Sequence, residues 1–387
     1  MIQRQALALI RKYSKQFRAL AVVGPRQSGK TTLVKQAFPN KPYISLENPD
    51  ERLWAQKDPR GFLNRFKTGA ILDEAQRSPD LFNYLQQIID ESNKDGQFIL
   101  TGSNNFMLQE SISQSLAGRI GYIDLLPLNY NEILEFKKKN YETEDLIFRG
   151  CYPEIYDKKR LPEIWYPSYI RTYVERDVKQ LRNIDNTLLF NRFLQLCAGR
   201  TGQLFSAAAI SNECGIDVRT VNAWIGILQS SYIIFLLPPH HNNFNKRVVK
   251  SPKLYFYDTG VACSLLGLKS KEEISVSHFK GALFENYVIT EIMKSNLNTG
   301  TNAKLYFWRD NNGTEIDLII DNNGKLLPIE IKSSQTYNEE FQRSLLKWNN
   351  YSGNKGGVLL YSGTMEMKTT ENIQVLNWKN HKSMKLK

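Results

Sequence analysis

Residues 20–33 read Leu-Ala-Val-Val-Gly-Pro-Arg-Gln-Ser-Gly-Lys-Thr-Thr-Leu. An apolar run, a loop with glycine at both ends, a lysine, a threonine and a helical continuation form the strand, loop and helix of a Walker A motif. Glycines let backbone N–H groups converge on phosphate oxygens, and the helix adds its positive N-terminal end. We expect Lys30 to reach the β- and γ-phosphates of ATP and the Thr31 hydroxyl to ligate Mg²⁺. For this stretch alone, the alternative is a glycine turn before an amphipathic helix. The predicted nucleotide-binding residues in the motif are Gly24, Arg26, Gln27, Ser28, Gly29, Lys30, Thr31 and Thr32.

A second motif, at residues 69–76, reads Gly-Ala-Ile-Leu-Asp-Glu-Ala-Gln. An apolar strand that ends in two adjacent acids is what a Walker B segment needs. We expect Asp73 to hold Mg²⁺ through its outer shell and Glu74 to polarise the attacking water. Two acids after a strand are often only the start of a solvated loop, but the preceding Walker A motif favours the catalytic interpretation.

Two further residues are candidates for sensing the γ-phosphate. The expected strand 97–100 ends in Thr-Gly-Ser-Asn, so that Ser103 or Asn104 would contact the γ-phosphate or the attacking water. A simple turn is the alternative. Arg119 precedes an apolar-leaning run and is a candidate arginine finger, acting in its own subunit or a neighbour's, although a solvated arginine would look the same.

Composition restricts the class of protein. A chain of 387 residues suggests two to three domains, and 41% hydrophobic with 23% charged residues is typical of a soluble globular protein. We find no apolar run of membrane-spanning length and no secretory signal. The four cysteines form no CxxC pair, which argues against a zinc site or disulfide scaffold and predicts a cytoplasmic location. The net charge of +12 favours a polyanionic partner.

Residues 204–228 have the pattern of a helix-turn-helix with Gly215 at the turn. Its second helix would expose Arg219, Thr220 and Asn222, where a DNA reader places its base contacts, and residues 232–237 would begin a wing. Such a unit also serves as a packing module within ATPases, so direct DNA contact and a purely structural role both remain open.

The pattern from residue 281 onward predicts a compact α/β unit with helices at 281–294 and 341–348 and strands at 305–308, 314–320, 326–331 and 357–361. Glu330 and Lys332 lie on one face of a strand, Asp317 can lie on its neighbour, and Glu285 comes from the preceding helix. This is the arrangement of the PD-(D/E)xK nuclease fold. Asp317 and Glu330 would hold Mg²⁺, whose bound water attacks phosphorus, while Lys332 orients that water and Glu285 supplies a third acid. A salt-bridged surface strand would look similar, and the fold can bind DNA without cutting it.

Together the motifs resemble bacterial and archaeal AAA-type ATP-binding proteins that carry domain of unknown function 4143 at the C-terminus. The resemblance also rests on Leu-Ala-Gly-Arg ending at Arg119, on residues 169–177 and on Lys-Leu-Tyr-Phe-Tyr-Asp-Thr-Gly at residues 253–260. It implies that Lys30, Thr31, Asp73 and Glu74 carry the nucleotide chemistry, with Arg119 as a further candidate, and that the tail is nuclease-like. Cys151 stands where this family more usually has a second glycine.

We therefore predict an α/β protein with three parts: an additional-strand P-loop ATPase domain at residues 1–135, a helical and winged-helix region at 136–255, and a restriction-endonuclease-like domain at 256–387. The expected function is ATP hydrolysis coupled to a metal-dependent nuclease-like domain that acts on DNA, with ATP and Mg²⁺ as cofactors and possible homo-oligomerisation. The alternative is a nucleotide-switched regulator or scaffold whose C-terminal domain grips DNA or a protein without cleaving. A partner-only ATPase is less compatible with the net charge of +12.

Overall fold

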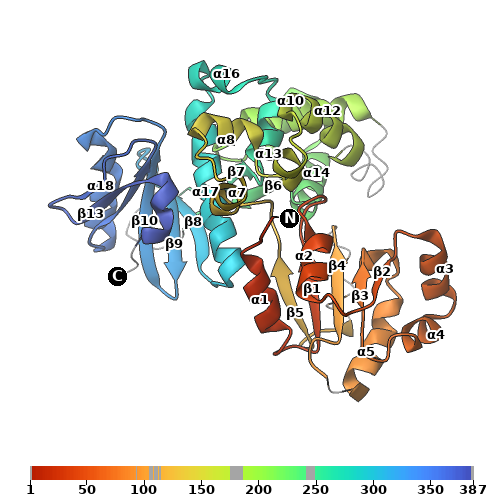
Figure 1. Ribbon diagram of the computed structural model, residues 1–387. Helices are drawn as coiled ribbons and strands as arrows, with labels where there is room; N and C mark the ends of the chain where they lie inside the picture. Colours follow the sequence, from red (N-terminus) through yellow and green to blue (C-terminus); the bar gives the residue numbers. More distant parts are fainter. Residues whose placement is uncertain are drawn as a thin grey trace.

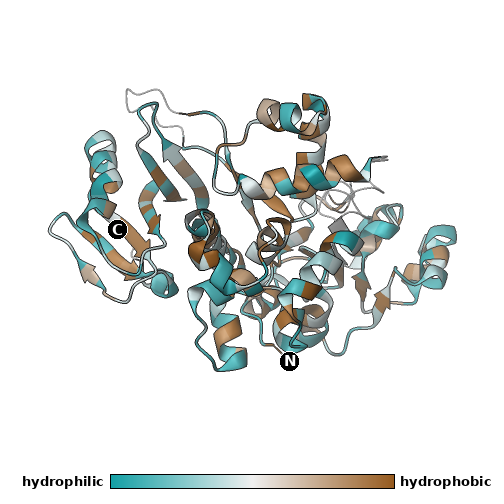
Figure 2. Ribbon diagram, turned by 90° about the horizontal axis from the view of Figure 1, so that it is seen from above, coloured by the Kyte–Doolittle hydropathy of each residue, from teal (hydrophilic) through white to brown (hydrophobic). Residues whose placement is uncertain are grey.

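The computed structural model describes residues 2–92, 94–103, 108, 112, 115–174, 186–240 and 249–384. Figure 1 shows three parts that follow one another along the chain: a parallel sheet with its helices, a mostly helical middle part and a second sheet. In Figure 2 the outermost helices at the two ends of the molecule are largely polar, as expected for solvated faces.

The first part is built on a parallel sheet. Its strands, in spatial order, are β2 (Tyr43–Ser45), β3 (Ile71–Asp73), β4 (Phe98–Gly102), β1 (Ala19–Val23) and β5 (Ile120–Asp124). Strand β4 is inserted between the strand that leads into the phosphate loop and the strand that ends in Asp73. This is the additional strand that the sequence predicts, and it brings the carboxyl ends of β1, β3 and β4 to one edge of the sheet.

Helices cover both faces of this sheet because alternate strand residues point to opposite faces. Helices α1 (Ala6–Tyr13) and α2 (Lys30–Ala37) bury their apolar sides against Leu20 and Val22. Helices α3 (Pro49–Lys57), α4 (Pro59–Asn64) and α5 (Leu81–Ser92) pack on the other face with Ala21 and Leu100. The short helix η1 (Ala75–Arg77) follows β3 directly.

The middle part is mainly helical. Its elements are α7 (Tyr130–Lys137), α8 (Thr143–Arg149), α9 (Pro153–Asp157), α10 (Pro162–Tyr169), η2 (Ile170–Val174), α12 (Thr187–Gly199), α13 (Ala207–Cys214), α14 (Val218–Ser230), β6 (Ile234–Leu237), β7 (Lys253–Phe256), α15 (Thr259–Leu265) and α16 (Lys271–Val276). Ser206 and Asp217 accept backbone N–H groups at the starts of α13 and α14, and Gly215 between them has a φ of 70°. Strands β6 and β7 pair antiparallel, and Leu204 bridges to Lys253 on β7.

The third part contains α17 (Lys280–Thr299), η3 (Glu339–Gln342), α18 (Arg343–Ser352) and η4 (Trp378–Ser383) around a mixed sheet. The strands are β8 (Lys304–Arg309), β9 (Glu315–Asn322), β10 (Lys325–Lys332), β11 (Gly357–Tyr361), β12 (Met367–Lys368) and β13 (Ile373–Asn377), in the order β12-β13-β11-β10-β9-β8. Strands β12 and β13 were not predicted from the sequence.

The predicted boundary between residues 255 and 256 falls inside β7. Helices α15 and α16 pack against α8, so they belong structurally to the middle part, and the third part begins with α17. Helix α17 contacts α1 and β5 of the first part as well as β10 of the third, and Figure 1 shows it running between the two sheets. Among the described helices, none has the length and apolar character needed to cross a membrane.

Candidate functional site

The phosphate loop, residues 24–29, connects β1 to α2 at the carboxyl edge of the first sheet. Gly24 has a φ of 149°, and a Cβ atom there would lie 2.1 Å from the carbonyl oxygen of Leu125. Gly29 caps α2 in the left-handed region with a φ of 92°. These two glycines are therefore required by the backbone path, and the loop adopts the strand, loop and helix order that the sequence predicts.

Lys30 is buried at the first position of α2. Its Nζ donates hydrogen bonds to the carbonyl oxygens of Gly24, at 2.9 Å, and Pro25, at 2.8 Å. Burial lowers the pKa of Lys30 to about 8, although Glu74 and Asp73 act in the opposite direction. The buried Ser28 hydroxyl has no hydrogen-bond partner in the described part of the chain. A lysine held on the loop and an unpartnered hydroxyl fit a site for phosphate oxygens.

The metal side of this site is formed by Thr31 and Asp73. The Thr31 hydroxyl lies 3.1 Å from both carboxylate oxygens of Asp73. Tyr43 on β2 donates its hydroxyl to Asp73 Oδ2 at 2.7 Å, and Thr101 on β4 donates to Asp73 Oδ1. Neither Tyr43 nor Thr101 was predicted from the sequence as a site residue. They lie on β2 and β4, the strands on either side of β3. The hydroxyl and carboxylate pair fits a Mg²⁺ ion carried by ATP.

Glu74 follows Asp73 in a left-handed conformation, with a φ of 54°. Its Oε2 accepts hydrogen bonds from the Ser103 hydroxyl at 2.8 Å and from Gln76 Nε2 at 2.5 Å. The structure therefore brings Ser103 and Glu74 together at the edge where ATP would lie. Asn104, the alternative sensor, lies outside the described residues, as do residues 175–177 of the stretch 169–177 on which the resemblance rests.

The remaining predicted residues of the loop differ in exposure. Gln27 and Thr32 are exposed, whereas Arg26 is half-buried with its guanidinium 5.2 Å from the ring of Tyr173. Arg4, which the sequence analysis did not single out, donates from Nη1 to the Ser28 carbonyl oxygen at 2.6 Å. Arg4 is buried, so it supports the loop from behind.

Arg119 does not lie at this site. It immediately precedes β5, whose first residue pairs with Ala19, the first residue of β1. Because the strands are parallel, Arg119 lies at the opposite edge of the sheet from the phosphate loop, where it forms an ion pair of 2.6 Å with Asp90. The interpretation of Arg119 as a finger for the nucleotide of its own chain is wrong for this conformation, and a role toward a second copy stays a prediction.

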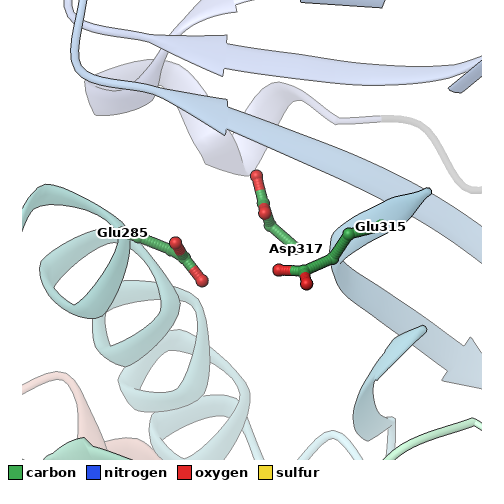
Figure 3. Close-up of side chains that lie close together, drawn as sticks. All are labelled: Glu285, Glu315 and Asp317. Atoms are coloured by element: carbon green, nitrogen blue, oxygen red, sulfur yellow. The ribbon is translucent and has the colours of Figure 1, made fainter. Parts of the chain in front are cut away.

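A second cluster of functional groups lies where α17 meets the C-terminal sheet. Glu285 on α17 faces Glu315 and Asp317 on β9, as Figure 3 shows. One carboxylate oxygen from each of the three lies within 4.8 Å of the others. Of these three, Glu285 and Asp317 were predicted from the sequence and Glu315 was not. The alternation of side chains along a strand places residues 315 and 317 on the same face, so that signal was available.

The neighbouring strand β10 supplies Glu330 and Lys332. The β9–β10 register pairs Leu318 with Ile329, and the backbone N–H of Ile331 donates to Asp317 Oδ2 at 2.8 Å. Lys332 Nζ lies 2.5 Å from Glu330 Oε1, while Glu330 Oε2 is buried with no partner in the described structure. Burial and the charge of Asp317 raise the pKa of Glu330 well above its usual range. The predicted acids and lysine are thus brought together.

A residue of the middle part completes this cluster. Lys253 on β7 has Nζ 2.9 Å from Glu285 Oε1 and forms a second ion pair with Glu315 Oε1. Tyr255 donates its hydroxyl to Glu285 Oε1 at 2.5 Å. Burial raises the pKa of Glu285 to about 7, with Asp317 acting in the same direction and Lys253 against it. Lys253 was missed as a site residue, since only packing places β7 beside α17.

The helix-turn-helix candidates lie on α14. Arg219 and Asn222 are exposed and Thr220 is half-buried, with its hydroxyl donating to Asp217. The buried side of the helix carries Val221 and Trp224. The predicted contact residues therefore lie on the solvent side of α14.

Three families match successive segments of the chain. An AAA domain matches residues 16–134, domain of unknown function DUF8612 matches residues 140–272, and domain of unknown function DUF4143 matches residues 280–380. The last two descriptions assign no activity.

The curated relatives are uncharacterized proteins. One from Mycobacterium tuberculosis is 29% identical over 338 residues, which cover 86% of this chain and 74% of the relative. One from Methanocaldococcus jannaschii is 26% identical over 300 residues, covering 70% of this chain and 62% of the relative. Among solved structures, the chain is similar to a Walker-type ATPase of Pyrococcus abyssi with a TM-score of 0.48 and 16% identity, over 68% of this chain and 96% of that one.

Proposed function

We propose that this chain, an AAA-type protein with a C-terminal domain of unknown function 4143, hydrolyses ATP and uses its nucleotide state to control how the other two parts engage DNA. The observation that carries the ATPase proposal is the convergence of Lys30, Thr31, Asp73 and Glu74 at one edge of the parallel sheet. Of these contacts, the 3.1 Å distance between the Thr31 hydroxyl and the Asp73 carboxylate joins the two Walker motifs directly.

In this proposal the loop amides and Lys30 bind the phosphates, and Thr31 and Asp73 hold Mg²⁺, which would offset phosphate charge when bound. Glu74 orients and activates the attacking water, and Ser103 fixes the position of the Glu74 carboxylate. Tyr43 and Thr101 position Asp73 through their hydroxyls.

A buried polar network connects the phosphate loop to α17. Arg4 donates to the Ser28 carbonyl oxygen and, from Nη2, to the Leu126 carbonyl oxygen at 2.7 Å. Two residues further, Lys294 of α17 donates to the Leu128 carbonyl oxygen at 3.0 Å. Glu291 of α17 accepts the backbone N–H of Tyr130 at 2.7 Å. A displacement of the phosphate loop on nucleotide binding would therefore be transmitted through these bonds to α17, the helix that carries Glu285.

The DNA-binding proposal rests on the middle part. The element order of α12, the Leu204 bridge, α13, α14 and the β6–β7 pair supports a winged-helix interpretation, in which α14 would be the recognition helix. Tyr232, just after α14, donates its hydroxyl to Asp124 at the end of β5 with an O···O distance of 2.5 Å. This contact would connect the DNA-facing unit to the ATPase sheet.

A second candidate function is metal-dependent cleavage of DNA. The order α17, β8, β9, β10, α18, β11 supports a PD-(D/E)xK interpretation. Further support is that Glu285 lies on α17, Asp317 on β9, and Glu330 and Lys332 on β10. The observation that favours this candidate is Glu330 Oε2, which is buried, has no partner among the described residues and could ligate a cation. In that case Asp317 and Glu330 would hold Mg²⁺, and Lys332 would orient the attacking water.

The proposal is tested by measuring ATP hydrolysis and DNA binding in one set of variants. We expect Lys30→Ala to abolish ATP binding and, with it, any effect of ATP on DNA affinity. Arg219→Ala should weaken DNA binding by about 1–3 kcal/mol, whereas Arg60→Ala, an exposed arginine on α4, should not. If Lys30→Ala leaves ATP-dependent DNA binding and cleavage unchanged at saturating ATP, the coupling is refuted.

Cleavage is tested separately on supercoiled, linear and branched DNA with Mg²⁺ or Mn²⁺, beside Asp317→Ala. Cutting that disappears in the variant would support the nuclease candidate. Retained DNA binding without cutting by either protein would favour the nucleotide-switched regulator, since the ATPase and the DNA-binding unit would then account for the function alone.

A further inference from the structure

We infer that the C-terminal acidic cluster is a divalent-cation site whose cation position is occupied by the ammonium group of Lys253, so that a metal ion can bind only when Lys253 withdraws. This inference rests on the proposed metal-binding role of the same cluster. The new element is that Lys253, on strand β7 of the middle part, competes with the metal ion for the carboxylates of the cluster.

The position of Lys253 is the first observation. Its side chain is 3% exposed and reaches between α17 and β9, where it pairs with Glu285 and Glu315. Those two acids, with Asp317, are the three whose carboxylate oxygens lie within 4.8 Å of one another. The ammonium therefore contacts two of the three carboxylates that lie close enough together to share one metal ion.

The second observation concerns Glu330. Its Oε2 is buried and, among the residues that the structure describes, nothing bonds to it, while Oε1 accepts from Lys332. The residue is 4% exposed, and its strand pairs with the strand that carries Asp317. An unpartnered carboxylate oxygen at this depth is costly unless a cation or proton donor completes it.

The charges give the same result. Four carboxylates, from Glu285, Glu315, Asp317 and Glu330, share three nearby cationic side chains, because Arg309 also pairs with Glu315 at 3.3 Å. When all four carboxylates are ionised, as metal ligation requires, withdrawal of Lys253 leaves four negative charges against the two positive charges of Lys332 and Arg309. A divalent ion would match this excess of two. An ion bound at about 2.0–2.1 Å from Glu285 Oε1 would lie no more than about 5 Å from the ammonium, so the two cations repel.

The strand that carries Lys253 makes this competition controllable. Strand β7 pairs with β6, which follows the proposed recognition helix, and Lys253 itself bridges to Leu204 between α12 and α13. A shift of the β6–β7 pair would move the Lys253 ammonium out of the cluster. Binding of DNA to the middle part would therefore allow a divalent cation to enter the metal site.

The experiment titrates Mn²⁺ into the nucleotide-free full chain and follows free Mn²⁺ by electron paramagnetic resonance. We expect Lys253→Met to bind one Mn²⁺ at least ten-fold more tightly than the wild type and to gain more thermal stability from it. Lys253→Arg keeps the positive charge and should bind as weakly as the wild type. Lys253→Met combined with Glu285→Gln should lose the gain.

Equal Mn²⁺ affinity in the wild type and Lys253→Met would overturn the inference. If Lys253→Met does not fold, the Mn²⁺ titration of the wild type still tests the inference. Tight binding of one Mn²⁺ to the wild type that Glu285→Gln abolishes would overturn the inference, and weak binding would support it. A Lys253→Met chain that binds Mn²⁺ tightly without cutting DNA would keep the inference and refute the nuclease candidate.

Discussion

Replacement of Lys294 by methionine should strongly destabilise the contact between the ATPase sheet and α17. Lys294 is 1% exposed, and its Nζ lies 2.9 Å from Glu291 Oε1 and 3.0 Å from the Leu128 carbonyl oxygen. Glu291 is fully buried, so the substitution leaves a carboxylate with only the Tyr130 N–H as its hydrogen-bond donor among the bonds described. Breaking a buried ion pair from one side costs about 3–5 kcal/mol. In a cooperative unit of about 150–250 residues, 1 kcal/mol corresponds to about 2–4 °C, so we expect a Tm lower by roughly 10 °C.

The matched control is Lys280→Met on the same helix. Lys280 also forms an ion pair across parts of the molecule, 3.4 Å from Glu144, but its side chain is 32% exposed. A partly exposed pair of this kind contributes about 0–1 kcal/mol. Combining Lys294→Met with Glu291→Gln removes both buried charges and keeps an oxygen for the Tyr130 N–H, so we expect most of the lost stability to return.

The assay is equilibrium unfolding in urea, with thermal unfolding beside it, on the wild type, both single lysine variants and the double variant. If Lys294→Met loses no more stability than Lys280→Met, the argument from the buried charge is refuted. If the double variant is as unstable as Lys294→Met alone, the loss comes from packing rather than from the unpaired Glu291.

Three further predictions concern the nucleotide site. Burial lowers the pKa of Lys30 to about 8, whereas its value in the unfolded chain is 10.5, so the stability of the free protein should rise as the pH goes from about 8 to 10.5. The affinity for ATP should instead fall by up to about ten-fold per pH unit above 8, because Lys30 loses its positive charge. Titration with a fluorescent ATP analogue between pH 7 and 9.5 checks this, and a flat profile would contradict it. Tyr43→Phe removes a hydrogen bond to the Asp73 carboxylate worth about 1.5–3 kcal/mol, so it should slow ATP hydrolysis about ten-fold or more. The control Tyr84→Phe, on the surface of α5 and 36% exposed, should leave the rate unchanged. Equal hydrolysis rates in the two variants would exclude the positioning role of Tyr43. Gly24→Ala places a Cβ 2.1 Å from a carbonyl oxygen, so it should lower the free energy of unfolding by at least about 2 kcal/mol and abolish ATP binding. Gly226→Ala, on α14 with open space around it, should raise the free energy of unfolding by about 0.5–1 kcal/mol. Chemical denaturation measures both changes.

Two predictions from the sequence, the role of Arg119 and the set of C-terminal acids, could have been corrected with rules of strand direction and side-chain alternation. Arg119 precedes a parallel strand, and residues before and after such strands lie at opposite edges of the sheet, so its distance from the phosphate loop follows from strand direction alone. Glu315 stands two residues before Asp317 on one strand, and the period of two places both on one face. The first correction needs the parallel pairing of β1 and β5, and the second needs only the alternation of side chains along β9.

The sequence by itself determined the phosphate loop, because strand, glycines, lysine and helix are contiguous and the backbone geometry that they require is local. It also determined the two acids at the end of β3 and the opposed acids of β9 and β10, since strand ends and alternation follow from hydrophobic pattern. Only the tertiary structure decided which distant side chains complete these sites: Arg4 behind the loop, Tyr43 on Asp73 and Lys253 among the C-terminal acids. Those contacts join segments whose proximity is set by helix and sheet packing, and packing energy is spread over many apolar residues that carry no local signal of which polar groups they bring together.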